Sequence, residues 1–190
     1  QSKHDSELYT IIRKMSDMKE DPNVNKVELK KIEIELEKKS SETHWISEAN
    51  ELARMNWWTI EYGLIGDLNN PKIYGAGLLS SVSESLDCLD KKVKKIPISI
   101  QCIHQDYNIT EPQPQLYVAN NFKDLIKLLD DYSKTMGFKT GGEEGVKKAI
   151  QSENVTTTVC DSGLQISGII NNYISDNNGE LTYLSYDKNV

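Results

Sequence analysis

The sequence predicts a mainly α-helical protein of the α+β class. Apolar residues recur at three- and four-residue steps in several segments, and β-branched residues gather near the C-terminal end. With 37% hydrophobic and 27% charged residues in 190, the core is expected to be modest. These observations indicate one packed central domain, residues 45–142, with two polar attachments, residues 1–44 and 143–190.

The first attachment, residues 1–44, is predicted to be a helical hairpin. One amphipathic helix is expected from about Ser6 to Lys19 and a second from about Val24 to Lys39. The sequence from Glu20 to Asn23 contains a proline and separates them. Lysines and glutamates alternate on the surface of this arm, which favours a solvated helix face over a docking arm.

The central segment contains three more expected helices and several short strands. The helices run from Ser47 into Glu61, where Gly63 weakens the helix, from Leu78 to Leu89, and from Asn121 to Met136. Short strands are expected at 72–74, 97–100 and 115–118. The buried stripe of the last helix is predicted to comprise Phe122, Leu125, Ile126, Leu128 and Leu129.

The second attachment, residues 143–190, is predicted to be a small antiparallel β appendage. Three stretches within it, 155–160, 164–170 and 181–184, are rich in β-branched residues. Asn178 and Gly179 form a hairpin-turn signal between the last strands.

Composition and charge exclude several classes of function. The formal net charge of −7, from 29 acidic and 22 basic residues, disfavours nucleic acid as a partner. No apolar run approaches the roughly 20 residues that cross a bilayer, so no membrane partner and a cytoplasmic location are expected. The three cysteines, Cys88, Cys102 and Cys160, are too few and too widely spaced for a disulfide framework or a thiolate zinc site.

Glu61 is the residue that most directly indicates chemistry. It stands among Trp57, Trp58 and Tyr62 at the end of an apolar helix, where an unpaired charge would be costly to bury. A metal ion would compensate that charge. The three histidines, His4, His44 and His104, lack the spacing that would place two ligands on one helix face, so the sequence shows no complete metal site.

Three motifs, in order along the chain, resemble the pterin-dependent aromatic amino acid hydroxylases. The first is WWTIEYGL from Trp57 to Leu64, similar to the family's Trp-Phe-Thr-Val-Glu-Phe-Gly-Leu segment. The second is YGAGLLSS from Tyr74 to Ser81, followed by Glu84. The third runs from Asn108 to Val118 and is similar to a Thr-Glu-x-Gln-Pro run ahead of a strand. The resemblance spans roughly residues 53–142.

This resemblance implies a role for each of five residues. Glu61 is similar to the carboxylate ligand of a ferrous iron site completed by two histidines. Ser80 would support the iron site and substrate pocket, Glu84 would hold the amino-acid substrate, and Trp57 would line the site. Ile109 stands where an acidic residue marks tyrosine hydroxylases, so phenylalanine is the expected substrate and tryptophan the second choice.

The resemblance also implies the cofactors Fe(II) and tetrahydrobiopterin, with O2 and an aromatic amino acid as substrates. The fold would be the C-terminal half of the hydroxylase catalytic domain, with the helical hairpin inserted and the β appendage added. The chain would then be a C-terminal fragment of a phenylalanine 4-monooxygenase-like parent, lacking the histidine pair and inactive alone, with a homo-oligomer as a possible assembly. Two alternatives remain open: a non-catalytic partner-binding or oligomerisation module derived from the family, and a stand-alone pterin-binding protein.

Overall fold

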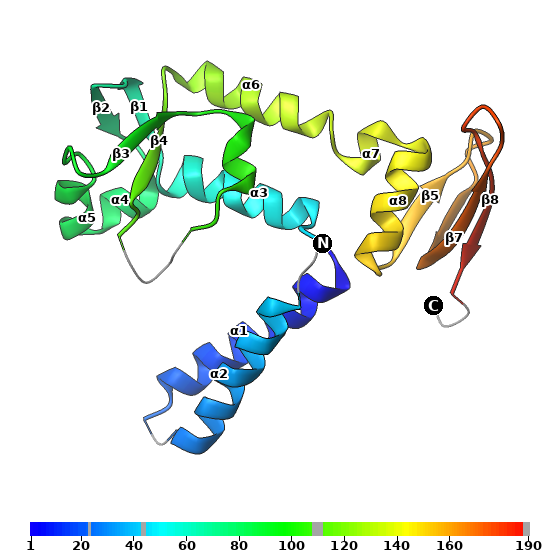
Figure 1. Cartoon of the computed structure of the whole chain (residues 1–190), viewed down its shortest axis with the longest axis horizontal. Helices are drawn as coiled ribbons and strands as arrows, with labels where there is room; N and C mark the ends of the chain where they lie inside the picture. The colour runs from blue at the N-terminus through cyan, green and yellow to red at the C-terminus, as the bar shows by residue number, and fades with distance from the viewer. Residues whose placement is uncertain (23, 43–44, 108–111, 188–190) are drawn as a thin grey trace. The chain divides into compact units, whose positions relative to one another are not determined.

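The computed structural model describes residues 1–22, 24–42, 45–107 and 112–187. They form two compact units, one made of residues 48–139 and the other of residues 1–47 together with 140–190. The mixture of helices and small sheets confirms the predicted α+β class (Figure 1). The proposed division at residues 44 and 142 stays a prediction. Within the described residues, no helix combines the length and apolar character that crossing a membrane requires.

The unit 48–139 is built around a four-stranded sheet with the order β2-β1-β4-β3. Strand β4 pairs in parallel with both β1 and β3, whereas β1 and β2 form an antiparallel hairpin. The strands are β1 (Leu64–Asp67), β2 (Asn70–Ile73), β3 (Lys94–Pro97) and β4 (Gln115–Ala119). The helices are α3 (Glu48–Asn56), η1 (Trp57–Glu61), α4 (Ala76–Ser80), α5 (Val82–Asp87), η2 (Ile100–His104), α6 (Phe122–Ser133) and α7 (Gly137–Thr140), the last ending just past the unit's boundary.

The core of this unit is formed by strands of the sheet and by helical segments that include α3, which contributes Met55. Strand β4 is buried over four consecutive residues, Leu116 to Ala119, as expected for a strand with neighbours on both sides. Trp58 is the largest buried side chain, at 1% exposure, and its indole N–H donates to the carbonyl of Gln105 at 2.9 Å. Cys88 and Cys102 are buried free thiols in the same core.

Three sequence predictions for this unit are corrected by the structure. The strand expected at 97–100 lies earlier, at Lys94–Pro97, and is followed by the 3-10 helix η2. This strand, β3, lies at the edge of the sheet, so it can accommodate Pro97, which has no N–H to donate. The helix expected from Leu78 to Leu89 breaks at Ser81, whose hydroxyl accepts from the backbone N–H of Glu84 and so begins α5.

The buried stripe predicted for α6 is too wide. Phe122, Ile126 and Leu129 are 58%, 62% and 51% exposed, whereas Leu128 and Tyr132 are buried. The inward face is fixed by Tyr132, whose hydroxyl lies 2.9 Å from the carboxylate of Glu51 and 3.1 Å from the carbonyl of Glu48, and can donate its one proton to either. These contacts turn the Tyr132 face of the helix toward α3 and leave an apolar face outward.

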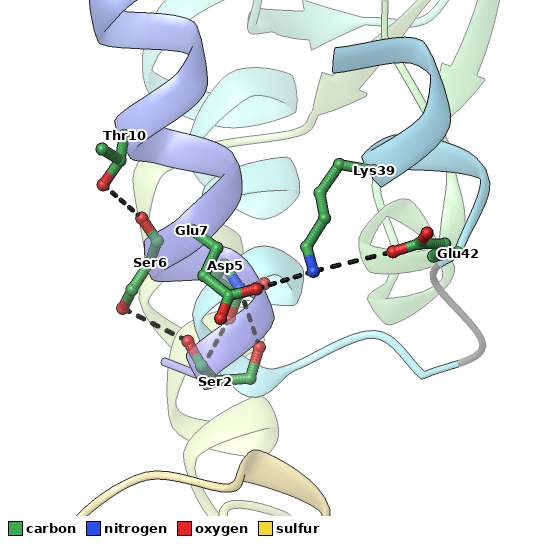
Figure 2. Close-up of polar contacts among 7 residues, drawn as sticks. All are labelled: Ser2, Asp5, Ser6, Glu7, Thr10, Lys39 and Glu42. Atoms are coloured by element: carbon green, nitrogen blue, oxygen red, sulfur yellow. Dashed lines mark hydrogen bonds and ion pairs between the residues drawn. The ribbon is translucent and has the colours of Figure 1, made fainter. Parts of the chain in front are cut away.

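Residues 1–41 form the predicted helical hairpin, with α1 at Lys3–Glu20 and α2 at Lys26–Ser41. The two helices lie side by side (Figure 1). Ser2 and Asp5 make a reciprocal capping box at the start of α1, and Lys39 of α2 pairs with Glu7 at 2.6 Å and with Glu42 at 3.6 Å (Figure 2).

The residues from 142 onward contain a helix that the sequence interpretation missed. It is α8 (Gly142–Ser152), which places Val146 and Ala149 against Ile170. The strands form two antiparallel pairs, β5 (Thr156–Val159) with β6 (Gln165–Gly168), and β7 (Ile170–Ser175) with β8 (Leu181–Tyr186). The predicted turn at Asn178 and Gly179 connects β7 and β8, with Gly179 at a φ of +84°.

Candidate functional site

Glu61 lies at the end of a π-helical turn, and not in the α-helix that the sequence predicts there. The chain leaves α3 at Asn56 and winds as η1 through Trp57–Glu61, with the N–H of Tyr62 donating to the carbonyl of Trp57 at 2.8 Å. The buried Thr59 hydroxyl donates to the carbonyl of Met55 at 2.6 Å. Because π-helical turns are frequently found at functional sites, this departure from the predicted geometry supports a functional role for the segment.

Two glycines of the second motif allow another part of the chain to approach Glu61 closely. A Cβ added to Gly75 would lie 2.4 Å from the backbone oxygen of Glu61 and 2.6 Å from the nitrogen of Gly63. A Cβ on Gly77 would lie 3.4 Å from Oε2 of Glu61. The N–H of Gly75 donates to the carbonyl of Gly63 at 3.0 Å. The first turn of α4 therefore packs directly against the end of η1.

The carboxylate of Glu61 is half-buried and has no hydrogen-bond or ion-pair partner among the described residues. Its Oε2 lies beside Gly77 of the second motif, 3.4 Å from where a Cβ on that residue would stand. An unpaired carboxylate in such a position is suited to receive a cation.

Tyr62, the residue after Glu61, forms a hydrogen bond with Glu84. Its hydroxyl donates to the carboxylate of Glu84, with Oη 3.1 Å from one oxygen and 3.4 Å from the other. Burial, together with the charges of Glu84 and Glu61, raises the pKa of Tyr62 to about 12. The phenol therefore stays protonated near neutral pH and acts as a donor.

Trp57 forms the middle of a stack of three aromatic rings. Its ring centroid lies 4.5 Å from that of Tyr62 and 4.2 Å from that of Tyr107, with interplanar angles of 17° and 11°. Its Nε1 is buried with no hydrogen-bond partner among the described residues. The adjacent Trp58 packs in the core, so the two tryptophans have different roles.

The structure brings together some of the residues that the sequence singled out. Tyr62 links Trp57 on one side with Glu84 on the other and follows Glu61 directly. Ser80 is exposed, and its hydroxyl donates to the carbonyl of Gly77 at 2.9 Å, a bond within α4. Ile109 lies outside the described residues.

One residue of this cluster, Tyr107, was missed by the sequence interpretation. Its only signal was an aromatic side chain just before the third motif. Tyr62 stands where the resembling segment has phenylalanine, so it adds one hydroxyl to the site.

The described residues fit one corner of a metal site and not a whole one. Among them, no group of three or more histidine, cysteine, aspartate or glutamate side chains could hold a metal ion. The chain contains only three histidines, and none of them is spaced as a helix-borne pair. Glu61 alone cannot complete the shell of a ferrous ion.

Comparison with known proteins identifies the family of this chain. The family model for the biopterin-dependent aromatic amino acid hydroxylases matches residues 33–143, more than half of the chain. The chain therefore belongs to that family, which confirms the resemblance inferred from the three motifs.

Among its relatives is the phenylalanine-4-hydroxylase of Bos taurus, 40% identical over 87 residues that make up 45% of this chain and 19% of that protein. The Chromobacterium violaceum enzyme is 41% identical over 76 residues, 39% of this chain and 26% of that protein. A crystal structure of the latter with iron and phenylalanine bound matches at 33% identity and a TM-score of 0.41, covering 45% of this chain and 35% of that one. The chain thus spans about a fifth to a quarter of the length of these curated relatives.

Proposed function

We propose that these residues supply the glutamate corner of a ferrous iron site in a tetrahydrobiopterin-dependent monooxygenase that converts phenylalanine to tyrosine with O2. The observation that carries the proposal is the unpaired, half-buried carboxylate of Glu61, which lies at the end of a π-turn with its Oε2 beside Gly77 and its backbone against Gly75. Membership of the biopterin-dependent family supports it. The related Chromobacterium violaceum enzyme has been crystallised with iron and phenylalanine, and with iron(III) and 7,8-dihydrobiopterin.

The other site residues would bind and orient the amino acid. Glu84 offers a half-buried carboxylate whose only described side-chain partner is the neutral Tyr62 hydroxyl, so it can accept the substrate's ammonium group. Trp57 would form an aromatic wall, and Ser80 would support the pocket at the end of α4. Ile109, being apolar, favours a phenylalanine ring over a hydroxylated one, with tryptophan second.

Iron and pterin, when bound, supply the activation of dioxygen in such a site. Because the described residues do not complete the iron site, we assign no reaction step to them. Their contribution would be to present one anionic ligand, to orient the amino acid and to exclude water with the stacked aromatic rings.

The proposal is tested on the complete product of the gene that encodes these residues, whatever its length. With ferrous iron, tetrahydrobiopterin and O2, it should form tyrosine from phenylalanine, detected by chromatography. Reactions without the pterin serve as the control. The absence of any hydroxylated product from phenylalanine and from tryptophan would refute the proposed activity.

The 190 residues alone are expected to bind ferrous iron weakly and to be inactive, because one carboxylate cannot replace three ligands. Metal analysis after anaerobic loading and gel filtration should find substoichiometric iron. One tightly held iron per chain would contradict this expectation.

A non-catalytic partner-binding or oligomerisation module is the second candidate. The outward apolar face of α6, formed by Phe122, Ile126 and Leu129, favours it. The hydroxylation assay separates the two candidates, since such a module would form no product.

A further inference from the structure

Tyr62 carries a hydroxyl to which the sequence motifs assign no role. It lies between the two side chains that we assign to the amino-acid substrate, Glu84 and Trp57, and contacts both. We propose that Tyr62 is a positioning residue that holds the carboxylate of Glu84 and the ring of Trp57 in a fixed relation, as one surface that receives the amino acid. This inference rests on the proposed function.

The hydroxyl of Tyr62 restricts the side chain of Glu84. A phenol has one proton to donate, so one carboxylate oxygen, at 3.1 Å, accepts the bond, and the second oxygen lies beside it at 3.4 Å. A glutamate side chain loses several rotatable degrees of freedom when fixed, and a bond already present before substrate arrives removes that cost from binding. The remaining lone pairs of the carboxylate stay available for an ammonium group.

The ring of Tyr62 is held from two sides, which makes it a firm support for that bond. One face stacks on Trp57 at 4.5 Å between centroids. A Cβ added to Gly77 would lie only 3.0 Å from Cε2 of this ring, so the backbone of α4 packs against it. Because the ring cannot tilt without disturbing either neighbour, the hydroxyl keeps its place opposite Glu84.

The capping of α5 fixes the other end of the contact. Ser81 accepts from the N–H of Glu84, which sets the backbone of Glu84 at the third position of a short helix. Both partners of the Tyr62–Glu84 bond are therefore anchored by their own backbone, and the bond is preorganised.

The contact itself is tested in the 190-residue chain carrying 13C at the tyrosine Cζ atoms. Tyr62→Phe removes one signal and so assigns it. Glu84→Gln should then shift that signal, because the phenol loses an anionic acceptor. Tyr74 is the matched control: it is another half-buried tyrosine, burial alone raises its pKa, and its signal, assigned with Tyr74→Phe, should stay in place. An unmoved Tyr62 signal would refute the contact.

The positioning role is tested by kinetics on the complete gene product. Tyr62→Phe keeps the ring and should raise KM for phenylalanine about tenfold, while kcat changes by less than about threefold. The Tyr62→Phe/Glu84→Gln double variant should resemble Glu84→Gln alone, because the hydroxyl acts through that carboxylate. An unchanged KM, or effects of the two substitutions that simply multiply, would overturn the role.

The two proposals fail in distinguishable ways. A wild-type gene product that hydroxylates no aromatic amino acid refutes the proposed function, and the substrate role of Tyr62 with it. An active enzyme in which Tyr62→Phe leaves KM unchanged refutes only the positioning role.

Discussion

Replacing Glu61 by glutamine should lower hydroxylation by the complete gene product about a thousandfold or more, equivalent to roughly 4 kcal/mol of activation free energy. The substitution keeps the size and shape of the side chain but exchanges an anionic oxygen ligand for a neutral amide. A neutral amide is the weaker ligand for a divalent metal ion, so the iron content of the purified protein should fall together with kcat. Steady-state kinetics and metal analysis on the same preparation measure both.

Glu180→Gln provides the control for the loss of one negative charge. Glu180 is exposed in the turn between β7 and β8, and only its backbone is hydrogen-bonded there. This variant should keep wild-type activity and iron content. If Glu61→Gln retained full activity, Glu61 would not be a ligand and the proposed iron corner would be wrong.

Gly75→Ala should destabilise the unit 48–139 by about 3 kcal/mol or more. The backbone at Gly75, with φ −61° and ψ 132°, is one that alanine adopts freely, so the expected cost is steric. The new Cβ would lie 2.4 Å from the oxygen and 2.8 Å from the carbonyl carbon of Glu61, and 2.6 Å from the nitrogen of Gly63. These are backbone atoms and cannot move aside by changing rotamer. Urea unfolding followed by tryptophan fluorescence measures the change.

Gly77→Ala is the matched comparison two residues further on. Its Cβ would meet a ring carbon of Tyr62 at 3.0 Å and the oxygen of Glu61 at 3.1 Å, which small shifts can relieve. Because Gly77 lies in α4, alanine also gains up to about 1 kcal/mol of helix propensity, so a net loss of about 1 kcal/mol or less is expected. Equal destabilisation by both variants would show that close packing at Gly75 is not the cause.

Sequence patterns predicted the helices that have a continuous apolar stripe and clear end signals. The hairpin of α1 and α2 is the clearest case, since proline and asparagine interrupt a regular repeat. Helix α8 was missed because its apolar positions, chiefly Val146, Ala149 and Ile150, are few in a segment that was interpreted by its following β-branched residues. Packing of Val146 and Ala149 against Ile170 stabilises this helix despite its weak local sequence signal.

The sequence motifs proposed residues for the candidate site but could not predict its geometry. The motifs indicated Glu61 and Glu84, yet helical periodicity would continue α3 as an α-helix through Glu61. No periodic signal distinguishes a π-turn from an α-turn over five residues. The link through the hydroxyl of Tyr62 depends on contacts between segments 22 residues apart in sequence, which only the folded chain shows.

The π-turn determines the direction of Glu61, the proposed metal ligand. Ordinary α-helical winding has fewer residues per turn, so relaxing η1 to it would rotate Glu61, the last residue of the turn, around the helix axis. The carboxylate of Glu61 would then point in another direction, although its own chemistry would be unchanged. A substitution elsewhere in the chain that loosens the packing of Gly75 and Gly77 against η1 could thus abolish the proposed metal binding by reorienting Glu61.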